Sequence, residues 1–256
     1  MNREQEYMDR LLVHYNYAQE HCPYPIFGVF LVGSQNYGLD DEQSDVDAYA
    51  MYIQKPRERL WWPLPHFQYL PEKGQTTGIS FYHWLGALKR QTFPKNCFEC
   101  LITDYVIINP LFQEEWDQIQ NIKSYLFSKY SANFHYGMFQ EYQGLLERAT
   151  YNKKLAVHCK RFQLIFEQGS PQFSPVELLK MTFLSEEERR NLIDQRRGRQ
   201  PIDTDELISH CLCPHNDFVL TKPTSQQDKF LDAQKEQIWN SVLNKLENNG
   251  KKELME

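Results

Sequence analysis

Two apolar runs separated by a polar turn constrain the fold of this chain more than any other feature. The first run ends in a glycine and a serine, Gly33 and Ser34, and the second covers residues 46–53. Short runs rich in β-branched and aromatic residues are typical of buried strands. Asp45 precedes the second run and Asp47 is its second residue, and side chains two apart in a strand project from one face. We therefore predict a sheet that carries two carboxylates side by side.

The remaining periodicity indicates a sheet-containing first part and a helical second part. Residues 3–20 have helical spacing, residues 78–91 begin as a short strand or turn that runs into a helix, and residues 105–110 form another strand. Beyond that strand, apolar residues recur at helical spacing nearly to the end. We predict an α/β (α+β) fold with a first domain over residues 1–112 and a helical C-terminal domain over residues 113–256.

Composition excludes several classes of protein. The chain of 256 residues is 41% apolar and 24% charged, as in soluble globular proteins. No stretch approaches the roughly 18 to 20 consecutive apolar residues of a membrane span, and the first residues are too polar for a signal peptide, so we expect a cytoplasmic protein. The net charge of −6 gives no general attraction to nucleic acid, and such a contact would need a local basic patch.

Paired carboxylates beside a glycine-serine turn suggest a site for a metal and a phosphate. Asp45 and Asp47 repel each other unless a cation lies between them, and Mg²⁺ or Mn²⁺ prefers carboxylate oxygens. The backbone N–H groups of the Gly33–Ser34 turn, together with the Ser34 hydroxyl, can bind an anion closely. Each fragment alone is equally typical of an ordinary loop or a polar edge strand, but together, with ten residues between Ser34 and Asp45, they are more specific.

The segment "GSQNYGLDDEQSDVDAYAMYI" resembles the signature of the DNA polymerase β superfamily of nucleotidyltransferases, a glycine-serine pair followed by Ser/Thr-Asp-x-Asp. It is most similar to the RlaP-like, RNA-repair-associated branch of bacteria and phages. Three later segments, "NCFECL", "KKLAVHCKRFQLIFEQG" and "NLIDQRRGRQPIDTDEL", resemble helices of that branch. The resemblance covers residues 25–210 and implies a minimal nucleotidyltransferase fold, with a short mixed sheet followed by a helical lobe.

The resemblance also implies an activity, which is the Mg²⁺-dependent transfer of an NMP from an NTP to an acceptor. The implied acceptor is a nucleic-acid end, RNA rather than DNA, or less readily a protein hydroxyl. Asp45 and Asp47 would bind the metal. The implied nucleotide-binding residues are Gly33, Ser34, Tyr37, Lys154, His158 and Arg161. The last three fall at i, i+4 and i+7 of one helix, a spacing equally typical of a solvated charged face.

One position departs from the family pattern. The family carries a third acidic residue on a later strand, and in this chain Gly78 stands at the expected place. Glu72 or Glu99 could supply the missing carboxylate. The alternative is a protein that binds nucleotide or nucleic acid on the same fold with little or no transfer activity.

Five arginines, at positions 189, 190, 196, 197 and 199, crowd the helix that follows Ser185. Ser185 and Glu188 have the spacing of a capping box, and Gly198 ends the helix. The arginines could bind a nucleic-acid backbone, or form ion pairs with Glu186 and its neighbours.

Three further features have both a functional and a structural interpretation. Trp61 and Trp62 could stack on a base or pack in the core. The possible zinc ligands are Cys97, Cys100, His210, Cys211, Cys213 and His215, although buried thiols are the commoner state of such cysteines. The final amphipathic segment could pack on the helical part or form a partner surface.

Overall fold

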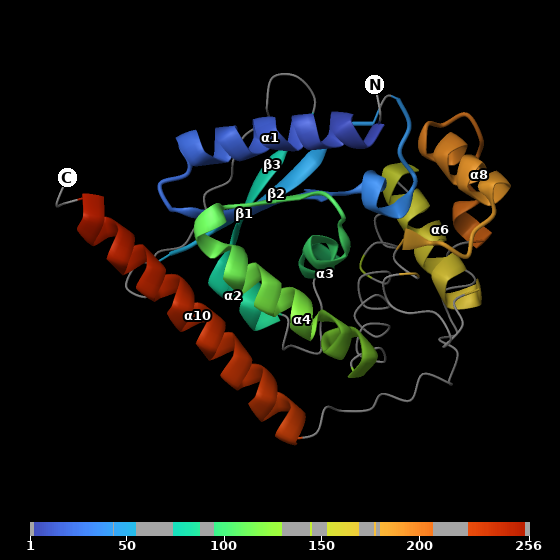
Figure 1. Cartoon of the computed structure of the whole chain (residues 1–256). Helices are drawn as coiled ribbons and strands as arrows, with labels where there is room; N and C mark the ends of the chain where they lie inside the picture. Colours follow the sequence, from blue (N-terminus) through green and yellow to red (C-terminus); the bar gives the residue numbers. More distant parts are fainter. Residues whose placement is uncertain are drawn as a thin grey trace.

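The computed structural model describes residues 3–42, 44–54, 74–87, 95–129, 144, 153–168, 177, 180–206 and 225–253 (Figure 1). The strands are β1 (Ile26–Val32), β2 (Asp47–Tyr52), β3 (Thr76–Ser80) and β4 (Val106–Ile108). The helices are α1 (Arg3–His21), α2 (Phe81–Ala87), α3 (Lys95–Ile102), α4 (Gln113–Lys129), α6 (Lys153–Gln168), α8 (Glu186–Arg196) and α10 (Ser225–Glu253), with 3₁₀ turns η1 (Ser34–Tyr37) and η3 (Pro110–Phe112).

The four strands form one mixed sheet in the order β3-β2-β1-β4. Strand β1 is antiparallel to both β2 and β4, whereas β2 and β3 are parallel. In the β1–β2 register, Val32 lies opposite Asp47, so the last residue of β1 is level with the first residue of β2. The predicted α/β class and the short mixed sheet are therefore confirmed.

Helices cover both faces of the sheet (Figure 1). Helix α1 packs on one face, which we call the α1 face, through a cluster that includes Leu11, Ala18, Val29, Leu31, Val46, Ala48, Ala50 and Tyr52. Helices α2, α3, α4 and α10 cover the opposite face. There Phe27 stacks on Phe81 with ring centroids 4.0 Å apart, and Met51 belongs to the same core cluster. Alternate residues of β2 thus face different layers.

The second part of the chain is helical where the structure describes it, as predicted. Helix α8 begins with the predicted capping box, since Ser185 Oγ accepts a hydrogen bond from Glu188 N and the Glu188 carboxylate accepts one from Ser185 N. Gly198, with φ 73°, follows the helix end. Helices α6 and α8 lie beside η1, at the end of β1 (Figure 1).

The C-terminal helix α10 packs on the sheet-containing part of the molecule. Trp239 lies 5.1 Å from Tyr82 and 6.3 Å from Phe81 between ring centroids. Lys245 bonds to the carboxylates of Glu114 and Glu115 at 2.8 and 3.0 Å. This helix therefore shares a hydrophobic core with residues of the predicted first domain. The boundary at residue 112 stays a prediction.

Among the helices that the structure describes, none has both the length and the apolar content needed to cross a bilayer.

Candidate nucleotide and metal site

The turn after β1 is built on two glycines in left-handed or otherwise unusual conformations. Gly33 has φ 93° and ψ −148°, and Gly38 has φ 64°. Residues other than glycine rarely adopt these backbone angles. Between them η1 is closed by a hydrogen bond from Asn36 N to Gly33 O, at 3.1 Å. The Asn36 side chain donates to Leu31 O at 2.9 Å and ties the turn to β1. The glycine-serine turn thus has a fixed backbone at the end of a buried strand.

The two aspartates flank a buried residue at the start of β2. Val46 between them is 1% exposed and packs on the α1 face, whereas Asp45 is exposed and Asp47 is half-buried. Strand alternation directs the Asp47 carboxylate away from α1. Asp45 lies before β2, because β1 ends at Val32, the partner of Asp47, so alternation does not fix the direction of its side chain. The expectation that a strand carries the two carboxylates side by side therefore stays a prediction for Asp45.

The glycine-serine turn and Asp47 are neighbours. A Cβ placed on Gly33 would lie 3.9 Å from Asp47 Oδ2. The other oxygen, Asp47 Oδ1, accepts a hydrogen bond from Gln75 N at 3.0 Å, which fixes the rotation of the carboxylate. Gln35, in the turn, donates through its side chain to Asp45 O. Turn and acids therefore form one site at the edge where β1 ends and β2 begins.

His14 supports this site from the other face of the sheet. Its side chain is 2% exposed, and Nδ1 lies 2.7 Å from Thr76 Oγ1. Burial lowers the pKa of His14 to about 4, and a hydrogen bond to the Val46 backbone opposes that shift. Gly74, with φ 127°, passes so close that a Cβ there would lie 1.9 Å from Val46 O. The residue between the two aspartates is thus held between α1 and the start of β3.

Sequence reasoning missed His14 because a lone histidine in an amphipathic helix carries no functional signal. Its partners lie 32 and 62 positions further along the chain, and only the parallel pairing of β2 with β3 brings them together.

Strand β3 presents no carboxylate beside the acid pair. Gly78 pairs with Ala50 and lies on the α1 face, so a side chain at this position would point away from Asp47. Thr77, which pairs with Tyr49, and Ile79, which pairs with Met51, are the β3 residues on the face of Asp47, and Thr77 is the nearer of the two in the register. A carboxylate at position 78 would therefore not reach Asp47.

Of the two residues proposed as substitutes for the third carboxylate, the structure describes one. Glu99 is buried in α3, and Glu72 lies outside the described residues. Across the described part of the chain, no three His, Cys, Asp or Glu side chains come together as a metal-binding group.

Of the implied nucleotide-binding residues, the structure brings Tyr37 and Arg161 together. The Arg161 guanidinium lies 3.7 Å above the centre of the Tyr37 ring, and the two side chains are 0% and 1% exposed. A cation over an aromatic face is stabilised electrostatically, which helps a charge to remain buried. His158 is half-buried on α6, and the side chain of Lys154 lies outside the described residues. Arg161 thus joins α6 to the turn and is not part of an open charged stripe.

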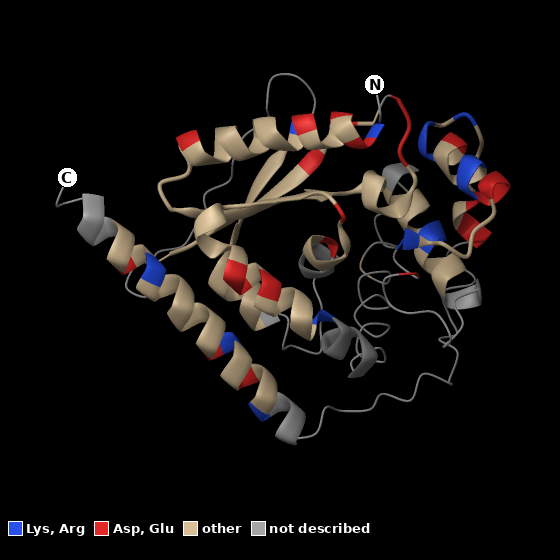
Figure 2. Ribbon diagram, in the orientation of Figure 1, with Lys and Arg blue, Asp and Glu red and all other residues tan. Residues whose placement is uncertain are grey.

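The arginines of α8 contact the loop between the turn and the acid pair. Arg189 Nη1 donates to Tyr37 O and Arg196 Nη1 to Leu39 O, both at 3.1 Å. Arg197 Nε donates to Asp41 Oδ2 at 2.8 Å, and Nη2 donates to Asp41 Oδ1. Figure 2 shows the acidic loop beside the basic C-terminal end of α8. Three arginines thus make intramolecular contacts with the turn and the loop, and a nucleic-acid contact or pairing with Glu186 stays a prediction.

Arg196 is a second residue that sequence reasoning did not place in the site. Burial is the main cause that lowers its pKa, together with repulsion from Arg197, whereas attraction by Asp41 and Asp47 opposes the shift. The guanidinium is therefore within electrostatic reach of Asp47. The sequence showed a basic cluster here but not which strand it faces.

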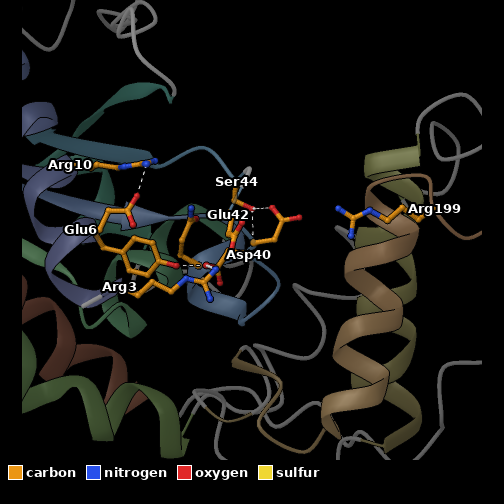
Figure 3. Close-up of a pocket in the computed structure, with 10 residues that line it drawn as sticks. Arg3, Glu6, Arg10, Asp40, Glu42, Ser44 and Arg199 are labelled. Atoms are coloured by element: carbon orange, nitrogen blue, oxygen red, sulfur yellow. Dashed lines mark hydrogen bonds and ion pairs between the residues drawn. The ribbon is translucent and has the colours of Figure 1, made fainter. Parts of the chain in front are cut away.

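A cavity of about 770 Å³ lies next to the site but does not include the acid pair (Figure 3). Its walls are formed by α1, by the loop after the turn and by Arg199. Most of its charges are paired, as in the 2.8 Å contact of Arg3 with Asp40 and the ion pair of Arg10 with Glu6. Neither Asp45 nor Asp47 lines it, and the residues from α1 place it on the α1 face. This cavity is distinct from the face that carries the carboxylates.

The possible zinc ligands and the tryptophan pair fall mostly outside the described residues. Cys100 is buried in α3, as expected for a thiol in the core. The other possible zinc ligands lie outside the described residues: the side chain of Cys97 and residues His210, Cys211, Cys213 and His215. Trp61 and Trp62 also lie outside them.

Comparison with known proteins gives a weak structural resemblance. No protein family model and no curated protein matches the chain. Among solved structures, the crystal structure of a nucleotidyltransferase-like protein from Exiguobacterium sibiricum matches with 13% sequence identity and a TM-score of 0.31, and covers 94% of this chain and 76% of that chain. At this TM-score the resemblance assigns no role to any residue of the present chain.

Proposed function

We propose that this protein is a Mg²⁺- or Mn²⁺-dependent nucleotidyltransferase that moves an NMP from an NTP to a hydroxyl group of an acceptor. The observation that carries the proposal is the nearness of Gly33 to the carboxylate of Asp47, with the exposed Asp45 two residues away. A phosphate-binding turn next to two carboxylates is the arrangement that metal-assisted phosphoryl chemistry needs.

The donor set fits a hard divalent cation. Asp45 and Asp47 offer only oxygen ligands, the type that Mg²⁺ and Mn²⁺ prefer, and they leave room for phosphate oxygens to complete the coordination. Asp47 keeps one oxygen for the Gln75 backbone and directs the other toward the turn. When bound, the cation would neutralise charge that develops on the phosphates during transfer.

The residues of the chain then have distinct roles. The backbone at Gly33 and the hydroxyl of Ser34 would hold the outer phosphates of the NTP, while Asp45 and Asp47 would hold the cation. The acceptor oxygen forms a bond to the α-phosphorus, the bond to the bridging oxygen breaks, and pyrophosphate leaves with the electron pair. The hydroxyl proton passes to solvent or to the departing phosphate.

The acceptor that we propose is a nucleic-acid end, RNA in preference to DNA. The support for this choice is the resemblance of residues 33–53 to the RNA-repair-associated branch.

A second candidate is a protein that binds NTP and metal without efficient transfer. The observation in its favour is that Thr77 occupies the β3 position on the acid-pair side, and a threonine hydroxyl neither ligates Mg²⁺ strongly nor takes a proton at neutral pH. Such a protein would show the same nucleotide binding but label no acceptor.

Thermal unfolding with and without NTP and Mg²⁺ tests the site. Ligand at a hundred times its Kd stabilises a fold by about 2.7 kcal/mol, which corresponds to a rise in Tm of about 5 to 10 °C for a chain of this size. We expect this rise for the wild type and its loss in the double variant Asp45→Asn, Asp47→Asn. Asp9→Asn, on the exposed side of α1, is the matched control. An equal rise in the double variant would exclude the site.

Incubation with each α-labelled NTP, Mg²⁺ or Mn²⁺, and RNA, DNA or protein acceptors separates the two candidates. Label that appears on RNA and depends on Asp47 supports transfer to a nucleic-acid end. Label on protein would replace that acceptor, and binding without label would favour the second candidate.

A further inference from the structure

We propose that Arg197 of α8 is a positioning residue that sets the affinity of the acid pair for its divalent cation. It acts through Asp41 and Ser44, which together hold the backbone that leads into Asp45. The proposal rests on the function proposed above and names an element outside the sheet that controls the same site.

The contacts form a closed network at the end of the loop. Besides its bonds to the Asp41 carboxylate, Arg197 donates through Nη2 to Ser44 Oγ at 3.3 Å. Ser44 Oγ donates to Asp41 Oδ1 at 3.1 Å and accepts from Asp41 N at 2.9 Å, and Ser44 N donates to Asp41 O at 3.0 Å. Ser44 is 7% exposed. Asp41 and Ser44 are thus held by each other and by Arg197, and Ser44 is bonded covalently to Asp45.

Asp45 needs this support more than Asp47 does. Asp47 is fixed by β-sheet pairing with Val32 and by the Gln75 hydrogen bond to its side chain. Asp45 lies before β2, and the Gln35 side chain donates a hydrogen bond to its carbonyl oxygen. The separation of the two carboxylates therefore depends on the loop, and the loop depends on α8.

Helix α8 is suited to act as a rigid support. Its N-terminus is capped, and Leu192 is buried in a cluster with Tyr37, Leu39, Met181 and Leu184. Arg189 and Arg196 bond to backbone carbonyls of the same loop at the positions described above. Arg197 therefore extends from a helix that is already fixed against the loop by packing and by two other arginines.

Positioning and simple electrostatics predict opposite effects at Arg197. Its positive charge is within electrostatic reach of Asp45. Removal of a positive charge near a cation site strengthens cation binding if charge alone matters. Loss of the support weakens binding, because residues that orient metal ligands typically contribute about 10- to 100-fold in affinity.

Mn²⁺ binding to the full-length protein, followed by the electron paramagnetic resonance signal of the free ion, tests the proposal without an acceptor. We expect Arg197→Gln to weaken Mn²⁺ binding about tenfold. Arg199→Gln is the matched control, since Arg199 is two residues away and pairs with Asp194 at 3.0 Å rather than with the loop. We expect its Mn²⁺ affinity to stay within about twofold of the wild type.

Ser44→Ala provides an arm without any change in charge. It removes the hydroxyl that joins Arg197 to Asp41, and we expect weaker Mn²⁺ binding in the same direction as for Arg197→Gln. If Arg197→Gln fails to fold, as judged by circular dichroism, Ser44→Ala decides the question alone.

The outcomes separate this inference from the proposed function. Wild-type protein that binds no Mn²⁺ overturns both. Wild-type protein that binds Mn²⁺, with Arg197→Gln and Ser44→Ala binding equally well or more tightly, overturns the positioning role and leaves the proposed function standing.

Discussion

The two aspartates of the site differ in how they are held. Asp47 is a strand residue with a fixed carboxylate, whereas Asp45 is exposed and lies in the loop. A pair with one fixed and one adaptable ligand can accept a cation without a large strain in the sheet. The adaptable member is also the one that a change elsewhere in the loop reaches first.

At Arg196 we expect a selective effect on nucleotide binding. The guanidinium donates to Leu39 O and is within reach of Asp47, so it is placed to contact the phosphates of a nucleotide bound at the acid pair. Since a hydrogen bond to a charged group contributes about 1.5 to 3 kcal/mol, Arg196→Gln should weaken NTP–Mg²⁺ binding about 10- to 100-fold. Mn²⁺ binding without nucleotide should weaken much less, because the contacts of Arg189 and Arg197 remain.

Isothermal titration with NTP and Mg²⁺, and with Mn²⁺ alone, measures both effects for Arg196→Gln. Arg190→Gln, exposed on the same helix, is the control and should leave both unchanged. An unaltered NTP affinity in Arg196→Gln would exclude Arg196 from the nucleotide site.

Gly38 is a residue of the turn where a side chain is poorly tolerated. Its φ of 64° is left-handed, and a Cβ there would lie 2.4 Å from Arg189 Nη1. Gly38→Ala should therefore lower the free energy of unfolding by about 1 to 3 kcal/mol, from backbone strain and from a displaced Arg189. Urea denaturation measures this. Gly144→Ala, where a Cβ meets nothing within 4 Å, should cause no loss.

At the scale of elements, α1 contributes more than a hydrophobic cover. Through His14 it holds Val46, and that contact requires a neutral imidazole in a buried place. An element on the far face of the sheet thus stabilises the backbone of the site.

The depressed pKa of His14 predicts a loss of stability in acid. In the unfolded chain the pKa of a histidine is about 6.5, and in the fold that of His14 is about 4, so the unfolded state binds the proton more tightly between these values. This stability is fully present above pH 6.5 and falls as the pH drops toward 4. The loss from this group between pH 7.5 and 4.5 should be about 2 to 3 kcal/mol.

Urea denaturation at several pH values measures the slope. His14→Gln should flatten it over this range, while His21→Gln, exposed on the same helix, should not. An unchanged slope in His14→Gln would show that the imidazole is not held neutral.

The sequence predicted local features well and long-range ones poorly. The capping box of α8, the strand at residues 47–52 and the turn at Gly33 depend on neighbours within a few positions, which periodicity and glycine placement reveal. The β3 residue that faces Asp47 depends on the parallel register with β2, which no local pattern encodes. The same holds for the arginines of α8, whose partners lie more than 150 positions earlier. Their roles required the fold.

At the scale of the whole molecule, α10 connects the end of the chain with the first strands. Trp239 lies against α2, and Ser241 donates to the buried carboxylate of Glu115 on α4. The helical part and the sheet therefore share one core at this point.

Trp239→Ala tests whether that core unfolds as one unit. Truncation of a buried tryptophan costs about 3 to 5 kcal/mol, and Trp239 is 7% exposed. We expect a large fall in Tm with a single transition by circular dichroism. Phe230→Ala, at a 44% exposed position of the same helix, should have a small effect. A separate transition for the sheet would instead support independent domains divided near residue 112.

The loop between the turn and Asp45 is joined to the sheet at both ends and to α8 in its middle. An inserted or deleted residue there would displace the arginine contacts relative to β1 or to β2. Natural relatives that keep the α8 arginines should therefore preserve the ten-residue spacing from Ser34 to Asp45, and variation in length should accumulate in other connections. In evolution the length of this loop would be constrained.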